Sequence, residues 1–299
     1  MMKPLKGIQL SQLVDTSQPS AVLEEVKANF VHHYPVSEFA HVREAFNVFN
    51  ALYEGGYPGY GKCNTKYHDK LHTTDALLAI SRLMDGYNIR NKKFSVSAAR
   101  IALIATMFHD SGYIQKRSDH KGTGAKFTLN HVERSIEFLK KYLTGLGYSR
   151  QDTKLAGSMV QCTGLNMSVY RLSFRNKPEK ILALMLGTSD LIGQMSSRTY
   201  LEKLSNLYSE FKEGHVSGYD SPFDLFKKTG SFYSLMKVRL EKDLENVQRY
   251  AKFHFNARYR INKNLYLTTI DSHMEHLVLI LKNGPKRFSR YLRRKSAHR

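Results

Sequence analysis

The feature that most constrains this chain is the recurrence of apolar side chains at helical spacing, which begins at about residue 20. In the segment 37–54, apolar residues lie three or four positions apart: Phe39, Val42, Phe46, Phe49 and Leu52. A helix with 3.6 residues per turn places such positions on one face. Alternating runs of Val, Ile or Thr bounded by Asn-Gly or Asp-Gly, which would indicate hairpins, do not occur. We therefore expect an all-α fold.

Capping residues and glycines predict where the helices begin and end. Ser37 is expected to cap a helix that Gly55-Gly56 ends, and a buried helix is predicted at about 95–111, with Gly112 at its stop. Further helices are predicted from the stretch at 67–77 to about Asp85-Gly86, from Thr128 to about Leu143, near 150–161, and from Asn176 with Pro178 through Asp190.

The chain is expected to form one compact multi-helix bundle over residues 21–281, with an N-terminal extension at 1–20 and a basic tail at 282–299. Its 299 residues, 41% of them apolar, can bury a large core. No Pro- or Ser-rich linker interrupts residues 20–280. The helices after about 198 are expected to wall a pocket without contributing a further buried polar cluster.

Lysine and arginine outnumber aspartate and glutamate by 46 to 26, which gives a formal net charge of +20. Such a chain attracts anionic partners, including phosphorylated metabolites, nucleic acid and acidic lipid headgroups. The N-terminus lacks the apolar stretch of a signal peptide, and apolar runs such as ILALML at 181–186 are too short to span a bilayer. The two cysteines, Cys63 and Cys162, fit a reducing compartment. We expect a cytoplasmic protein without a transmembrane segment.

Side chains that can bind metal occur in three apolar contexts. The stretch YHDKLHTTDAL at 67–77 places His68, His72 and Asp75 at helical positions i, i+4 and i+7. His109 and Asp110 end the buried helix, and Asp190 interrupts another apolar helix. A single buried histidine is usually a hydrogen-bonded core residue. Two imidazoles and two carboxylates in such contexts instead suit a divalent ion that keeps open water positions.

The order His, His-Asp, Asp resembles the HD superfamily of metal-dependent phosphohydrolases. YHDKLHTTDAL is similar to the Tyr-His-Asn-x-x-His-Ala-x-Asp-Val signature of the class I cyclic-nucleotide phosphodiesterases. The matching positions are Tyr67, His68, His72 and Asp75, and the departures are Asp69 for Asn, Thr73 for Ala and Ala76 for Val. The resemblance covers roughly residues 60–195.

The resemblance implies one or two divalent ions (Zn, Mn, Fe or Mg) held by His72, His109, Asp110 and Asp190. Asp110 would bridge the two ions, and His68 would be the general acid that protonates the leaving oxygen. The segment LNHVERSIEFL resembles the family's downstream histidine helix, which places His131 near the second ion as a supporting residue. Asp75 or Asp69 is expected to orient an imidazole.

Substrate contacts are predicted for two further places. The loop after His109-Asp110 carries four basic or titratable side chains that are candidates for phosphate binding: Lys116, Arg117, His120 and Lys121. An ordinary solvated basic loop is an equal alternative. Gln194 lies four residues after Asp190 on the same helix face and is a candidate for a base or ribose contact.

Three functions remain open from the sequence. The first is a phosphodiesterase that acts on a cyclic nucleotide or related diester. The second is an HD-type phosphomonoesterase or nucleotide phosphohydrolase, which is favoured because the glutamine and phenylalanine that clamp the purine in cyclic-nucleotide enzymes cannot be matched. The third is a module that binds polyanions or membrane surfaces, through the basic tail, and carries a vestigial metal site. The pair His32-His33 is interpreted as ordinary surface.

Overall fold

The computed structural model describes residues 8–165 and 167–292, and within these residues it contains eleven α-helices and no strand. The all-α prediction is confirmed. The helices have the following bounds: α1 Pro19–Val31, α2 Phe39–Glu54, α3 Lys70–Arg90, α4 Val96–Phe108, α5 His131–Gly145, α6 Arg150–Gln161, α7 Lys177–Ser196, α8 Tyr200–Glu213, α9 Pro222–Glu241, α10 Tyr250–Tyr259 and α11 Leu265–Leu281.

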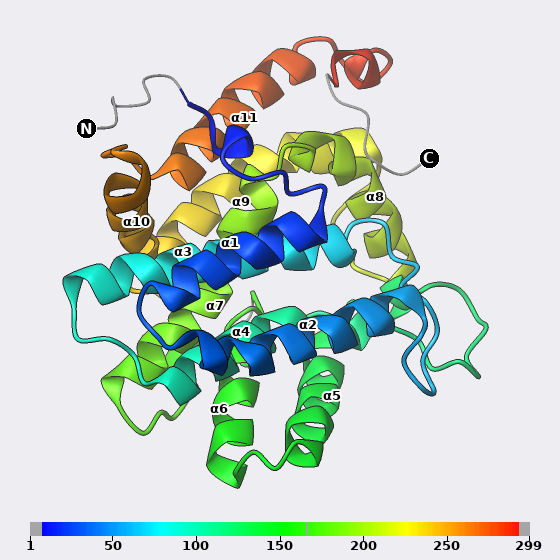
Figure 1. Ribbon diagram of the computed structural model, residues 1–299. Coiled ribbons are helices and arrows are strands. Elements are labelled where there is room, and N and C mark those ends of the chain that lie inside the picture. The colour runs from blue at the N-terminus through cyan, green and yellow to red at the C-terminus, as the bar shows by residue number, and fades with distance from the viewer. Residues whose placement is uncertain (1–7, 166, 293–299) are drawn as a thin grey trace.

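The long helix α3 lies at the centre of the molecule and packs against α1, α4, α7 and α10. Figure 1 shows α1 and α2 crossing one face of the bundle, while α5 and α6 form a helical pair at its lower edge. Buried apolar side chains from all eleven helices join in one hydrophobic cluster. Because this core surrounds the middle of α3 and α7, polar side chains such as Ser81, Arg82, Thr188 and Ser189 are buried there.

Several helix ends agree with the capping predictions. Ser95 and Asn176 accept hydrogen bonds from the backbone N–H groups three residues ahead and thereby cap α4 and α7. Gly55 ends α2 with a φ of 83°, a left-handed conformation that glycine adopts without a steric cost. The helix expected near 150–161 is α6.

Two predicted caps are wrong. Ser37 lies inside a short 3₁₀ turn, Val36–Glu38, that continues directly into α2, so its side chain caps nothing. Thr128 follows another 3₁₀ turn, Gly124–Phe127, and its hydroxyl donates to the carbonyl of Ala125. The N-cap of α5 is Asn130 and the helix begins at His131, two residues later than a cap at Thr128 predicts.

The start of α3 corrects the interpretation of YHDKLHTTDAL. Asp69 has an extended backbone, and its carboxylate accepts the backbone N–H of His72 at 2.9 Å, so Asp69 is the N-cap of the helix. His68 precedes the helix and does not share a helical stripe with His72 and Asp75. The prediction of one three-residue stripe is wrong for this reason.

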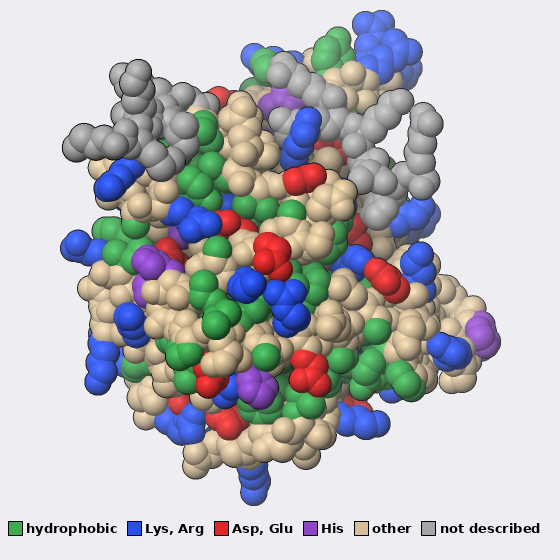
Figure 2. All heavy atoms as spheres, in the orientation of Figure 1, with side chains coloured by type: hydrophobic (Ala, Val, Ile, Leu, Met, Phe, Trp, Pro, Cys, Tyr) green, Lys and Arg blue, Asp and Glu red, His purple; other side chains and the backbone are tan. Residues whose placement is uncertain are grey.

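The face of the molecule in Figure 2 is mixed in charge. On the face in Figure 2, lysines and arginines are scattered among acidic side chains and do not gather into one patch. Part of the predicted basic tail packs against the protein, because the ring of Phe288 lies 5.0 Å from that of Phe226 on α9. Residues 293–299 of that tail lie outside the described residues. None of the described helices combines the length and the apolar composition needed to cross a membrane.

Candidate metal centre

Four side chains from three separate segments converge beside the core. His72 lies in the first turn of α3, His109 and Asp110 follow α4, and Asp190 lies within α7. His72 Nε2 is 3.1 Å from Asp110 Oδ2 and 3.2 Å from Asp190 Oδ1. His109 Nε2 is 3.4 Å and 3.5 Å from the same two oxygens. The four residues that were predicted as metal ligands are thus brought together.

The hydrogen bonds of this group favour a cation between its members. His109 Nδ1 donates to the carbonyl oxygen of Thr106 at 2.7 Å, because a carbonyl can only accept, and a neutral ring then has an unprotonated Nε2. That Nε2 and Asp110 Oδ2 are buried and make no hydrogen bond. Ligands about 2.1 Å from a tetrahedral ion lie about 3.4 Å apart, which is close to the 3.1–3.5 Å between the two histidine Nε2 atoms and the two carboxylate oxygens. The residues therefore fit a divalent metal.

The electrostatics of the group favour a positive charge at the same place. Burial alone would lower the pKa of His72, but Asp110 and Asp190 outweigh that effect and raise it to about 10. Burial would likewise raise the pKa of Asp110, but His109 and His72 hold it well below its ordinary value. Both carboxylates are ionised in a buried setting, which a proton or a metal ion can neutralise.

His131 extends the group on the other side of Asp110. Its Nδ1 donates to the carbonyl oxygen of Thr128 at 2.7 Å, and its Nε2 faces Asp110 Oδ1 at 3.8 Å. Burial lowers the pKa of His131, so the neutral ring is favoured. Its Nε2 then carries a lone pair that is directed at the Asp110 carboxylate. Two acceptors that face each other at this distance leave room for a water or a second ion.

His68 lies at the edge of the group and is held by a residue that the sequence interpretation missed. Its Nδ1 donates to Glu210 Oε2 on α8 at 2.7 Å, and its ring stacks on Tyr113 with centroids 4.4 Å apart. Glu210 also accepts the backbone N–H of Tyr67. The sequence could have indicated that Glu210 is buried, because Glu210 lies next to the apolar stripe of α8 formed by Leu204, Leu207 and Phe211.

The two aspartates that were expected to orient an imidazole have different surroundings. Asp69 caps α3 and forms a buried ion pair with Lys203 Nζ at 2.8 Å. It therefore positions His72 through the backbone of that residue. Burial raises the pKa of Asp75 to about 6, although the Ser197 hydroxyl and the charge of Lys203 oppose this shift. The helices after 198 were expected to contribute no further buried polar cluster, but they do contribute two buried charged side chains to this one, Lys203 and Glu210.

Two glycines permit the close approach of these segments. A Cβ atom at Gly112 would lie 2.0 Å from the carbonyl oxygen of His131, so the turn after Asp110 can meet the start of α5 only without a side chain. A Cβ atom at Gly193 would lie 3.0 Å from the backbone nitrogen of Ala76, where α7 crosses α3. These contacts set how near Asp190 and His131 lie to His72, His109 and Asp110.

A cavity of about 520 Å³ opens beside the candidate metal centre, and Asp190, His68 and His131 belong to its wall. Much of the lining is aromatic: Tyr67, Tyr113, Tyr200, Phe211, Tyr219 and Phe232. Among the described residues of the wall, Lys228 is the only lysine or arginine, and it is paired with Asp224 at 2.6 Å. Helices α8 and α9 supply much of the wall, in agreement with the expected role of residues after 198.

The predicted substrate residues have separate positions. Gln194 lines the cavity, but its Oε1 accepts the Tyr67 hydroxyl at 2.8 Å and its Nε2 donates to Asp190. The loop cations are not among the residues that line this cavity. Lys116 Nζ lies 3.8 Å from the ring centroid of Tyr60, and Arg117 donates to the carbonyl of Gly55. The side chains of His120 and Lys121 are exposed.

A comparison with protein families finds a match over a large part of the chain. A model of the Npun_R2479-like family matches residues 115–267, which is just over half of the 299 residues. The chain belongs to the Npun_R2479-like family. The segment that matches the Npun_R2479-like model includes His131, Asp190 and Glu210, whereas His72, His109 and Asp110 precede it. The description of the Npun_R2479-like family names no activity, and no curated protein matches the chain.

Proposed function

We propose that this protein is a metal-dependent phosphoester hydrolase, and that its substrate is a phosphodiester such as a cyclic nucleotide. The observation that carries the proposal is the pair of buried atoms without hydrogen bonds, His109 Nε2 and Asp110 Oδ2, facing His72 and Asp190. A resident ion suits this donor set, and the cavity beside it can hold a small phosphorylated molecule. The ion would be Zn²⁺, Mn²⁺, Fe²⁺ or Mg²⁺.

Different residues of the chain would have different roles in the reaction. When bound, the ion supplies Lewis-acid activation of water and neutralises phosphoryl charge. Glu210 accepts from Nδ1 and holds the His68 ring, so that in the imidazolium form the proton on Nε2 is the one that His68 can give to the departing oxygen. When an ion is bound, Nε2 of His109 and Nε2 of His131 would face it as neutral donor atoms, because each ring gives its Nδ1 proton to a backbone carbonyl. The aromatic wall excludes water and offers stacking surfaces for a base.

The charge of the cavity favours a substrate with one phosphate group. A polyphosphate carries several negative charges, and proteins usually neutralise them with several lysines or arginines. The described wall of this cavity offers Lys228 alone, already paired with Asp224. A diester with a single negative charge suits such a wall better than a nucleoside triphosphate.

A phosphomonoesterase or nucleotide phosphohydrolase is the second candidate. The observation that favours it is the engagement of Gln194 by Tyr67 and Asp190, which leaves this amide less available to read a base. A panel of cyclic nucleotides, nucleoside mono- and triphosphates and a generic diester separates the two candidates. Turnover of monoesters without turnover of any diester would replace the first candidate by the second.

The test of the proposal combines metal content with activity. We expect His109→Ala and Asp110→Ala to lose the metal of this centre together with hydrolysis, whereas His68→Ala keeps that metal and loses turnover. His41→Ala, at an exposed position on α2, is the matched control and should retain both. Wild-type protein that holds no stoichiometric metal after loading with each candidate ion would overturn the proposal.

A further inference from the structure

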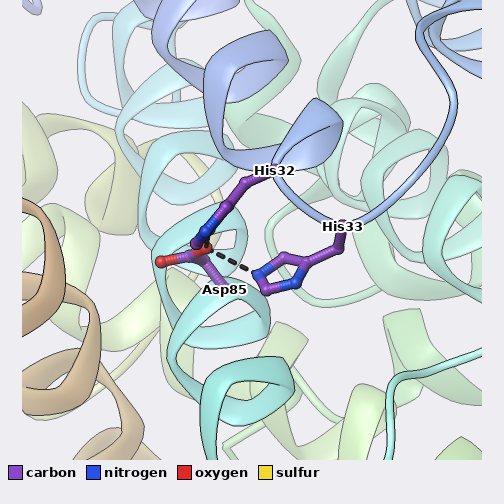
Figure 3. Close-up of side chains that lie close together, drawn as sticks. All are labelled: His32, His33 and Asp85. Carbon is purple, nitrogen blue, oxygen red and sulfur yellow. Dashed lines mark hydrogen bonds and ion pairs between the residues drawn. The ribbon is translucent and has the colours of Figure 1, made fainter.

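A second group of side chains with metal-binding atoms lies at the other end of α3. His32 and His33 follow the last residue of α1, and Asp85 lies thirteen positions beyond His72, or about 20 Å along the helix. His32 Nδ1 lies 2.9 Å and His33 Nε2 lies 2.8 Å from the same oxygen, Oδ1 of Asp85 (Figure 3). The interpretation of His32-His33 as ordinary surface is wrong for His33, whose side chain is 5% exposed.

We propose that His32, His33 and Asp85 bind a divalent transition ion such as Zn²⁺, which fastens the end of α1 to α3. Two imidazole nitrogens and one carboxylate oxygen are a common set of zinc ligands. The three ligand atoms lie within 4.8 Å of one another. The two imidazole nitrogens lie 2.9 Å and 2.8 Å from Asp85 Oδ1, which is about half an ångström less than the ~3.4 Å between the ligand atoms of a tetrahedral site. Binding therefore requires a small widening of the group.

The exposure of the three side chains provides an entry path and an open position. The side chains of His33 and Asp85 are 5% and 4% exposed, whereas the side chain of His32 is 59% exposed. An ion held from the buried side by Asp85 and His33 thus faces solvent beside His32, where water can complete a four-ligand shell. His32 is also the C-cap of α1, and the carbonyl groups at a helix C-terminus favour a cation.

Asp85 is supported in the way that metal-binding carboxylates usually are. Its second oxygen, Oδ2, accepts Nδ1–H of the fully buried His254 on α10 at 2.7 Å. The hydrogen-bond contacts at both oxygens fix the orientation of the Asp85 carboxyl before an ion arrives.

The same contacts without an ion would be a hydrogen-bonded clamp, because each imidazole can donate one N–H to Asp85. The measurement that separates the two is metal content. Full-length protein is stripped with a chelator, loaded with Zn²⁺, freed of excess ion by gel filtration and subjected to elemental analysis. We expect His32→Ala to carry one equivalent of zinc fewer than wild type, and the exposed-site control His41→Ala to equal wild type.

The design also distinguishes this ion from the one at the candidate metal centre. In an Asp110→Ala background, His32→Ala should again remove one equivalent, because the two groups share no residue. Added Zn²⁺ should raise the melting temperature of His109→Ala, in which His32, His33 and Asp85 are intact, and should raise that of His32→Ala/His109→Ala less. Equal zinc content in wild type, His32→Ala and Asp85→Asn would overturn the proposal and leave a hydrogen-bonded clamp.

Discussion

Two backbone carbonyls determine the chemistry of two histidines at the candidate metal centre. Thr106 and Thr128 each offer a carbonyl oxygen to the Nδ1 atom of the histidine three residues ahead, His109 and His131. In the neutral ring, each Nε2 is then an acceptor directed toward Asp110. An arrangement of acceptors facing acceptors is unfavourable by itself and becomes favourable with a cation between them.

The first prediction at the scale of single residues concerns Glu210. Glu210→Gln removes the charge that holds His68 Nδ1 but keeps a side chain of similar size. Supporting residues of this kind typically change activity by about 10- to 100-fold, so we expect kcat to fall by that amount with unchanged metal content. Steady-state kinetics with elemental analysis measures both. Glu241→Gln, at an exposed site on α9, is the control. Loss of metal in Glu210→Gln would show that Glu210 supports the ion and not His68.

The second prediction concerns the pH dependence of stability at Asp75. Its pKa in the folded protein, about 6, exceeds the ordinary value of 3.8, so its favourable effect on folding is present below pH 4 and is lost as the pH rises toward 6. Two pKa units correspond to about 3 kcal/mol, which is an upper limit. We expect Asp75→Asn to unfold at higher urea concentration than wild type at pH 8 and at a similar one at pH 4.

Chelator is present in these measurements so that metal binding does not contribute. Asp220→Asn, at an exposed carboxyl, should leave the urea midpoint unchanged at both pH values. A lower midpoint for Asp75→Asn at pH 8 would mean that the pairing of the Asp75 carboxylate with Lys203 and Ser197 outweighs its burial.

At the scale of helices, the crossing of α3 and α7 sets the distance between His72 and Asp190. Gly193→Ala places a methyl group 3.0 Å from the backbone of Ala76, and such overpacking typically costs about 1–3 kcal/mol. Gly230→Ala, within α9, meets no atom within 4 Å and should stabilise the helix by about 0.5–1 kcal/mol. The urea midpoint of unfolding should therefore fall in Gly193→Ala and rise in Gly230→Ala. Zinc affinity should fall in Gly193→Ala alone.

Much of this helical framework could be predicted because the signals are local. Ser95 and Asn176 cap helices by contacts within three residues, and the period of the apolar side chains reports helices directly. His68 was placed on a helix because the repeat of four continues across Asp69, although aspartate is itself a favoured N-cap that starts the helix one residue later.

The parts of the sites that could not be predicted depend on distant contacts. Glu210 meets His68 across 142 positions, and Asp85 meets His254 across 169. No local pattern specifies such a pair, and a histidine between polar neighbours, such as His33, looks exposed until its partner is known. His72, His109, Asp110 and Asp190 could be found because each is an ionisable residue in an apolar context, which is a local signal.

At the scale of the whole molecule, the lysines and arginines that give the formal charge of +20 are scattered over the face seen in Figure 2 and do not form one patch there. Residues 293–299 concentrate four lysines and arginines in seven positions. Residues 288–291 belong to a turn whose Phe288 packs on α9, and α9 also lines the cavity. A deletion that starts at 284 would therefore remove packing as well as charge, so a test of the basic end should start at 293.

The last prediction follows from that boundary. Deletion of 293–299 should leave hydrolysis unchanged and weaken binding to a polyanion such as single-stranded RNA. Each phosphate contact contributes about 0.7 to the slope of log affinity against log salt, so the loss of four cations should reduce the slope by up to about 3. Affinities measured by fluorescence anisotropy between about 50 and 200 mM salt, a range in which phosphate contacts change the affinity strongly, give the slope for wild type and the slope for the deletion. Charge reversal of Arg258 and Lys237, which lie on helices elsewhere, is the control. An unchanged slope after the deletion would place polyanion binding on the helical body, where the proposed cavity and its metal ligands lie.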